Sequence, residues 1–146
     1  MKKFNGPSGK KTNRKLFINL PVKDLNKSVK FFTKLGFKFN PKFTDKNATS
    51  MIINDDAYVM LLVEKFFRRF TKKTIINAKK NTESLTSISV SSRKEVDTMI
   101  NIAIKNGAKK LMSFDHGWMY GCDFEDLDGH IWELFYMDES KFPKKK

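Results

Sequence analysis

The order of sequence patterns along this chain is repeated, and the repeat limits the possible folds more than any other feature. Alternating apolar residues over 16–22 (LFINLPV) predict a half-buried strand. A helical apolar pattern follows from Leu25 to Leu35, with Asp24 able to cap its start and Gly36 ending it. The first half is completed by three further predicted strands, over 37–44, 50–54 and 58–64.

The second half shows the same order. A predicted strand over 85–90 precedes a helix that begins after Ser92, which forms a capping-box pattern with Glu95. Gly107 ends this helix, and strands are predicted over 109–114, 117–124 and 130–136. The chain therefore contains two βαβββ units, and we predict an α+β fold in which the two modules form a cupped sheet cavity.

The chain of 146 residues is 40% hydrophobic, which suits one domain with a substantial core. We predict that this domain covers 16–138. Its predicted parts are module one (16–64), a linker with short helices (65–82) and module two (83–138), flanked by a flexible basic arm (1–15) and a basic tail (139–146).

The net charge of +13 raises the question of nucleic-acid binding. Ten of the 29 Lys and Arg residues fall within 1–15 and 141–146, whereas all 16 acidic residues lie between these segments. The remaining chain is only mildly basic. We therefore expect weak, salt-sensitive nucleic-acid affinity through the tails, and not a nucleic-acid-binding domain.

The cysteine content and the apolar runs indicate the cellular setting. Cys122 is the single cysteine, so no internal disulfide can form, and a reducing environment is expected. No apolar run reaches the roughly 18 residues of a membrane span. The lysine-rich start lacks the apolar region of a signal peptide. These observations predict a cytoplasmic protein without a membrane partner.

The stretch DFEDLDGHIWELF (123–135) carries the densest set of polar groups in the chain. Its four acids are Asp123, Glu125, Asp126 and Asp128, and they lack the spacing of a calcium-binding loop. We interpret them as a solvated hairpin turn. We expect His130 to form a structural hydrogen bond on the helix-packed side of the sheet, and His116 to be exposed in a loop.

Two stretches carry a family resemblance. LPVKDLNKSVKFFTKLGFKF (20–39) and FEDLDGHIWELFYMD (124–138) resemble the opening strand and helix and the closing hairpin of the vicinal oxygen chelate superfamily. This superfamily includes glyoxalase I, bleomycin-resistance proteins and extradiol dioxygenases. The chain most resembles the glyoxalase-like branch, whose members are described as lactoylglutathione lyase-like. The resemblance implies the fold but does not determine the chemistry.

In such relatives, a metal is held by residues on the first and last strands of each module. The resemblance places these positions on Phe17, Met60, Leu85 and Glu133. Only Glu133 is a ligand for a hard metal ion, whereas a catalytic metal needs three or more protein donors. We therefore expect neither a metal nor another cofactor.

Glu133 is then the candidate catalytic residue, as a carboxylate among aromatic side chains that favour its neutral form. The alternative is that Glu133 is a relic of the ancestral site and is paired with a lysine or a backbone N–H group. The predicted ligand-binding residues are Phe17, Asn19, Tyr58, Met60, Trp118 and Tyr120, with closure of the pocket by Phe66, Phe67 or Phe70.

An aromatic cavity with one carboxylate suits a small apolar, aromatic or cationic molecule. The first functional hypothesis is therefore metal-free binding of an unknown small molecule by a homodimer. The alternative is a metal-dependent lyase of the lactoylglutathione lyase type, with Glu133 as ligand or base. A second alternative is polyanion binding by the basic tails.

Overall fold

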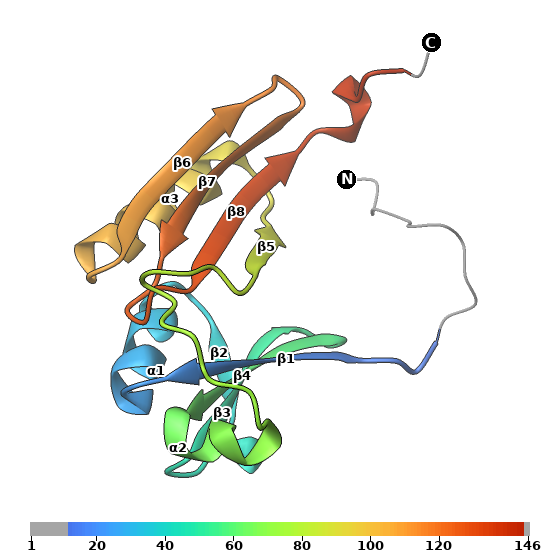
Figure 1. The fold of residues 1–146 in the computed structure, drawn as a ribbon. Coiled ribbons are helices and arrows are strands. Elements are labelled where there is room, and N and C mark those ends of the chain that lie inside the picture. The colour runs from blue at the N-terminus through green and yellow to red at the C-terminus, as the bar shows by residue number, and fades with distance from the viewer. Residues whose placement is uncertain (1–11, 145–146) are drawn as a thin grey trace.

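The computed structural model of the chain describes residues 12–144 as two modules, each containing one mixed four-stranded sheet (Figure 1). The sheets have the strand orders β1-β4-β3-β2 and β5-β8-β7-β6, so the second module repeats the topology of the first. Most of the predicted arm 1–15 and the last two residues of the tail lie outside the described residues. The chain has the predicted α+β fold of paired βαβββ modules, whose sheets do not close on each other and form a cup.

The first module contains β1 (Leu16–Val22), α1 (Leu25–Lys34), β2 (Lys38–Asn40), β3 (Ala48–Asn54) and β4 (Ala57–Val63). The connecting segment contains α2 (Glu64–Phe67) and a 3-10 turn (Arg68–Phe70). The second module contains β5 (Leu85–Ser89), α3 (Arg93–Lys105), β6 (Lys109–Asp115), β7 (Met119–Glu125) and β8 (Ile131–Met137). Short 3-10 turns follow β2 (Pro41–Phe43) and β8 (Glu139–Lys141).

The helices begin where their capping residues predict. The Asp24 carboxylate accepts a hydrogen bond from the Lys27 amide, and the Ser92 hydroxyl accepts one from the Glu95 amide, which satisfies donors that the first helical turn would otherwise leave free. Pro41 ends β2 earlier than predicted, because proline cannot donate to the strand ladder and starts a 3-10 turn instead.

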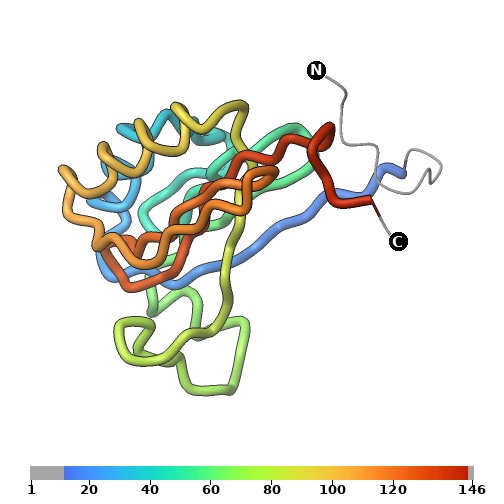
Figure 2. Tube along the Cα trace, turned by 90° about the horizontal axis from the view of Figure 1, so that it is seen from above, coloured from blue at the N-terminus to red at the C-terminus, as the bar shows by residue number. Residues whose placement is uncertain are grey.

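A single hydrophobic core joins the two modules on the helical side of both sheets. Phe32 of α1 packs against Trp132 of β8 with ring centroids 5.0 Å apart, and Phe31 packs against Phe124 of β7 at 6.2 Å. Figure 2 shows α1 and α3 on one side of the sheets and the segment 64–84 on the other. The sheet faces opposite the helices are called the open faces below.

The turn between β7 and β8 forms a polar joint between the modules. The Asp128 carboxylate accepts hydrogen bonds from the Lys23 amide at 2.9 Å and the Ser28 hydroxyl at 3.4 Å. The buried His130 ring contacts the Glu83 carboxylate through Nδ1 and the Pro21 carbonyl through Nε2, the latter at 2.6 Å. The joint therefore connects the end of β1, the start of α1 and the connecting segment to module two.

Asp126 lies inside this joint and corrects the prediction of a solvated turn. Its side chain is only 6% exposed, and its carboxylate accepts hydrogen bonds from the amides of Asp128 and His130 and from the Trp132 indole. The predicted structural role of His130 is confirmed, because its buried ring lies between two acceptors. No helix among the described residues is long and apolar enough to cross a membrane.

The Gly129→Ala substitution tests the close approach at this joint. Gly129 has φ +92°, and a Cβ there would lie 2.6 Å from the Lys79 amide nitrogen, so the connecting segment would have to shift. Gly36 has a similar φ of +95° with no atom within 4 Å of its Cβ position, which makes Gly36→Ala the matched control. We expect a cost of about 1–2 kcal/mol for the control from the left-handed backbone alone, and about 1–3 kcal/mol more for Gly129→Ala. Equal free energies of unfolding in urea would contradict this account.

The charge on His130 makes stability depend on pH. Burial opposes protonation of the ring, but the charge of Asp126, the Pro21 carbonyl and Glu83 together raise the pKa of His130. Burial also raises the pKa of Asp126, so both groups make the fold less stable as the pH rises.

The His130 contribution is complete below its unfolded pKa of about 6.5 and is lost as the pH rises through the raised folded pKa. We expect the urea-unfolding free energy of the wild type to fall above pH 6.5 by up to about 1.4 kcal/mol per pH unit, and His130→Gln to lack this slope. Identical slopes in the two proteins would show that His130 does not titrate in this window.

Candidate functional site

Glu133 lies on the open face of module two. Its neighbours Trp132 and Leu134 are each 1% exposed and belong to the core on the helical side. Because successive side chains of a strand point to opposite faces, Ile131, Glu133 and Phe135 point away from α3. All three are half-buried. The carboxylate therefore lies on a largely apolar strand surface.

The strand register places Glu133 in the middle of a polar row. Ser87 of β5 is its partner on one side and Asp123 of β7 its partner on the other. Paired residues of neighbouring strands point to the same face, so these three side chains lie side by side. Ser87 was not predicted, and Asp123, although it falls within the predicted strand 117–124, was grouped with the acids of the turn. The structure corrects this grouping, because β7 contains Asp123 and extends to Glu125.

Module one carries the corresponding row in a mostly uncharged form. Met60 of β4 is paired with Asn19 of β1 and with Ser50 of β3, as Glu133 is with Ser87 and Asp123. Thr49 and Ser50 are buried in β3, and Asn19 is exposed on β1. The resemblance already made Met60 and Glu133 equivalent, but their neighbours in each row depend on the pairing of distant strands and were not predicted.

Phe17 lies two residues before Asn19 on β1, and Leu85 lies two residues before Ser87 on β5. Both side chains therefore share the open faces with these rows. Their partners are Tyr58 and Ile131. They are among the most exposed large apolar side chains, at 52% and 66%. Phe17 stacks on Tyr58 with centroids 5.0 Å apart, and the Lys15 ammonium lies 5.6 Å from the Tyr58 ring. The open face of module one thus presents an aromatic pair beside Asn19 and Met60.

These residues do not fit the metal that the fold implies in relatives. In residues 12–144, no three His, Cys, Asp or Glu side chains are grouped so that they could hold a metal ion. The two carboxylates of the polar row face each other, and the corresponding positions in module one offer a thioether and neutral oxygen or amide groups. Such a donor set is poor for a catalytic divalent metal.

Tyr120 lies on the other side of the sheet from Glu133, which corrects its predicted place in the ligand pocket. Its register partner is Tyr136, so it shares the helical face with Trp132 and Leu134. Its hydroxyl donates to the Asp97 carboxylate of α3 at 2.5 Å, and this hydrogen bond raises the pKa of the phenol. The Arg93 guanidinium lies 4.8 Å from its ring centroid.

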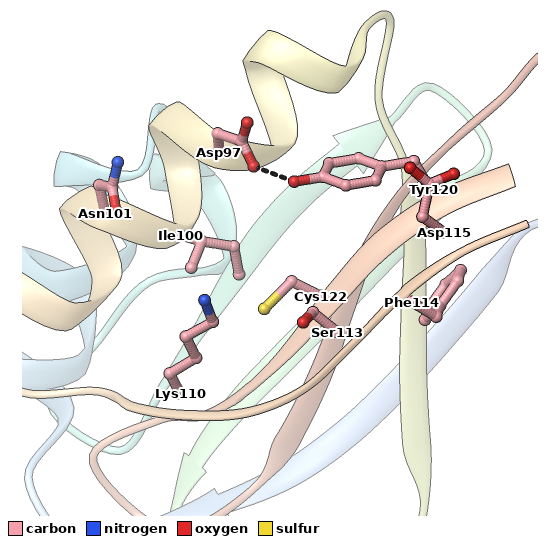
Figure 3. A pocket seen from close by; sticks show the side chains of 9 residues that line it. All are labelled: Asp97, Ile100, Asn101, Lys110, Ser113, Phe114, Asp115, Tyr120 and Cys122. Carbon is pink, nitrogen blue, oxygen red and sulfur yellow. Dashed lines mark hydrogen bonds between the residues drawn. The ribbon is translucent and has the colours of Figure 1, made fainter. Parts of the chain in front are cut away.

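Tyr120 helps to line a cavity of about 370 Å³ between α3 and strands β6 and β7 (Figure 3). Cys122 lies in the same cavity, with its thiol directed towards the Lys110 side chain. Burial raises the pKa of this thiol, so it is present as the neutral form. The predicted structural role of Cys122 as a small buried strand residue is therefore consistent with its environment.

The remaining predicted residues lie around the edges of the open faces. Trp118 precedes β7 and packs against Phe142 of the C-terminal segment at 4.7 Å. His116 is exposed and stacks on Phe114. Helix α2 contacts β1 and β4, so Phe66 and Phe67 are half-buried beside module one, whereas Phe70 is 69% exposed.

The connecting segment also covers a smaller cavity of about 190 Å³ beside the polar joint. Its lining includes His130 and Asp128 from the joint and Arg68 and Ile76 from the segment. Neither this cavity nor the one beside Tyr120 is lined by Glu133, Phe17 or Met60. Neither of these two cavities therefore contains the predicted site residues of the open faces.

Comparisons with known proteins agree with this geometry. The sequence profile of the family described as Bleomycin resistance protein-like N-terminal matches residues 14–54, which is most of module one. A comparison with curated protein sequences gave no significant match.

Among solved structures, the hypothetical protein SA1046 from S. aureus is 28% identical, with a TM-score of 0.72 over 87% of this chain and 95% of its own. A glyoxalase-related enzyme from Fulvimarina pelagi is 17% identical, with a TM-score of 0.71 over 86% of this chain and 88% of its own.

A third similar structure is the fosfomycin resistance protein FosX from Listeria monocytogenes, determined as a mutant with Mn(II) and 1S,2S-dihydroxypropylphosphonic acid. It is 19% identical, with a TM-score of 0.61 over 81% of this chain and 85% of its own. The profile match in module one and these structures together show that the chain has the two-module fold of glyoxalase and bleomycin-resistance proteins.

Proposed function

We propose that the chain binds a small aromatic or cationic molecule on its open sheet faces, without a metal. The observation that carries this proposal is the place of Glu133, a half-buried carboxylate on an apolar strand surface that offers too few donors for a metal site. A carboxylate in such a surface attracts a cation or a hydrogen-bond donor more strongly than it would in water.

The open face of module one supplies complementary contacts. Phe17 and Tyr58 form a stacked pair, and Met60 lies two residues along β4. Aromatic faces and a polarisable thioether favour planar and cationic ligands. The Asn19 side chain is exposed on the same face, where it could orient such a ligand by a hydrogen bond.

We further propose that two copies of the chain pair through these faces. Phe17 and Leu85 are more than half exposed on the open faces, although both are large apolar side chains. A twofold pairing that places module one of one protomer against module two of its partner would bury both residues and enclose a cavity. Each cavity would then combine the aromatic pair of one chain with the Glu133 row of the other.

Ligand binding can be tested by thermal shift and calorimetry. The panel should contain bleomycin, cationic aromatic compounds and their neutral counterparts. A ligand present at 100 times its Kd stabilises the folded state by about 2.7 kcal/mol, which gives a clear rise in Tm. We expect Glu133→Gln to weaken binding of the cationic compounds at least tenfold, and Lys144→Gln in the tail to have no effect. No stabilisation by any compound at millimolar concentration would contradict the proposal.

The oligomeric state can be tested by analytical ultracentrifugation. We expect the wild type to sediment as a dimer at micromolar concentration, and Phe17→Lys and Leu85→Lys to shift it to a monomer. Ile104→Lys is the matched control, because Ile104 is 40% exposed on α3, on the opposite side of the sheet. A monomeric wild type, or equal dissociation by all three variants, would refute pairing through the open faces.

A further inference from the structure

Asp123 and Glu133 are directly opposite each other on neighbouring antiparallel strands of the open face. Residues paired in this way have Cβ atoms about 4.5–5.5 Å apart, so the two carboxyl groups are within reach of each other. Like charges in this arrangement destabilise a sheet when both groups are ionised. The pair therefore requires a compensating charge or a proton.

Among the described residues, the register neighbours of the pair on β5 and β6 carry no charge of opposite sign. Ser87 is the neighbour of Glu133 on β5, and it is neutral. On β6, the register shifts between Lys110 and Ser113, so the apolar bulge residues Leu111 and Met112 lie beside Asp123. The next charged pair on this face is Glu125 of β7 with Lys109 of β6, two residues along β7 from Asp123.

One oxygen of Asp123 has no visible partner. Its Oδ1 atom is completely covered, and no hydrogen-bond donor among the described residues reaches it. Asp123 Oδ1 is the sole buried side-chain nitrogen or oxygen atom in residues 12–144 that lacks a partner. A covered acceptor without a donor costs about 1–3 kcal/mol, so this oxygen requires a donor beside it.

We propose that Asp123 and Glu133 share one proton, with the acid form of Asp123 donating its O–H to the Glu133 carboxylate. A single proton turns one of two facing acceptors into a donor, and it removes one of the two negative charges. The environment supports this assignment, because burial and then the charge and hydrogen bonding of Glu133 raise the pKa of Asp123.

This arrangement assigns a role to Asp123 that the superfamily resemblance does not supply. Asp123 is a positioning residue that holds Glu133 in one direction and limits the pair to one negative charge. If the proposed ligand-binding function is correct, the pair selects a monocation with N–H donors, such as an amidinium or a primary ammonium group. The apolar side chains of Ile131 and Phe135 on either side of Glu133 favour an aromatic body on that cation.

The shared proton can be tested without any ligand. Carboxyl ¹³C NMR of the wild type should show an Asp123 titration step above the usual Asp pKa of about 3.9. Glu133→Gln should return this step towards the usual value, since the neutral amide carries no charge. Glu125→Gln, on the same face one step away, should leave it unchanged. Independent titration of both groups near their usual values in the wild type would overturn the proposal.

The role of the carboxyl pair in ligand selectivity can be tested by calorimetry with benzamidine and its neutral isostere benzamide. The pH should lie below the Asp123 titration step. Glu133→Gln should weaken benzamidine binding at least tenfold and leave benzamide unaffected. Asp123→Asn should keep benzamidine affinity within threefold, because an amide also donates to Glu133 and the net charge of the pair stays at one. A tenfold loss in Asp123→Asn would show that both carboxylates are ionised and would refute the shared proton.

The two experiments separate the two claims. A raised Asp123 step with no benzamidine binding would uphold the shared proton and refute the ligand class together with the cationic part of the proposed function. Benzamidine binding with two ordinary titrations would support the proposed function and refute the shared proton.

Discussion

The packing of α1 against the second sheet determines how the two modules are placed. Phe31 and Phe32 are adjacent on this helix, and they reach Phe124 and Trp132 of the other module. All four rings are at most 3% exposed. Each aromatic pair of this kind contributes about 0.5–1.5 kcal/mol beyond the burial of its area. Because the contact lies on the helical side, it fixes the sheets without covering either open face with α1 or α3.

Polar groups then determine the alignment of the modules at one edge of this core. The turn between β7 and β8 uses Asp128 to bind the start of α1 and His130 to bind the end of β1. Directional hydrogen bonds of buried or charged groups specify one geometry more strictly than apolar contact does. The sequence DLDGH therefore serves assembly of the fold, and the glycine within it allows the connecting segment to pass closely over the turn.

Much of the fold could be predicted from local patterns. Strand alternation and helical periodicity are short-range signals, and the capping residues Asp24 and Ser92 act within their own first turns. The structural role of His130 was also predictable, because alternation from Glu133 placed it near the helical side. These predictions depend on residues close together in the sequence.

The candidate site was less predictable, because it depends on which residues of distant strands are paired. Tyr120 was assigned to the wrong face, since its position is fixed by its pairing with Tyr136. Asp123 falls within the predicted strand 117–124, but it was grouped with the turn acids because its pairing with Glu133 depends on the register. Ser87 has no local signal at all. Only the register of the folded sheet brings these side chains into one row.

The two equivalent rows differ in one chemical respect that has a consequence for recognition. The row of module one is Asn19, Met60 and Ser50, with no ionisable group, whereas the row of module two contains two carboxyl groups. A molecule held between one row of each kind meets electrostatic attraction at one end only. Such a molecule has a single favourable orientation, head to tail, even though the protein backbone around it is nearly symmetric.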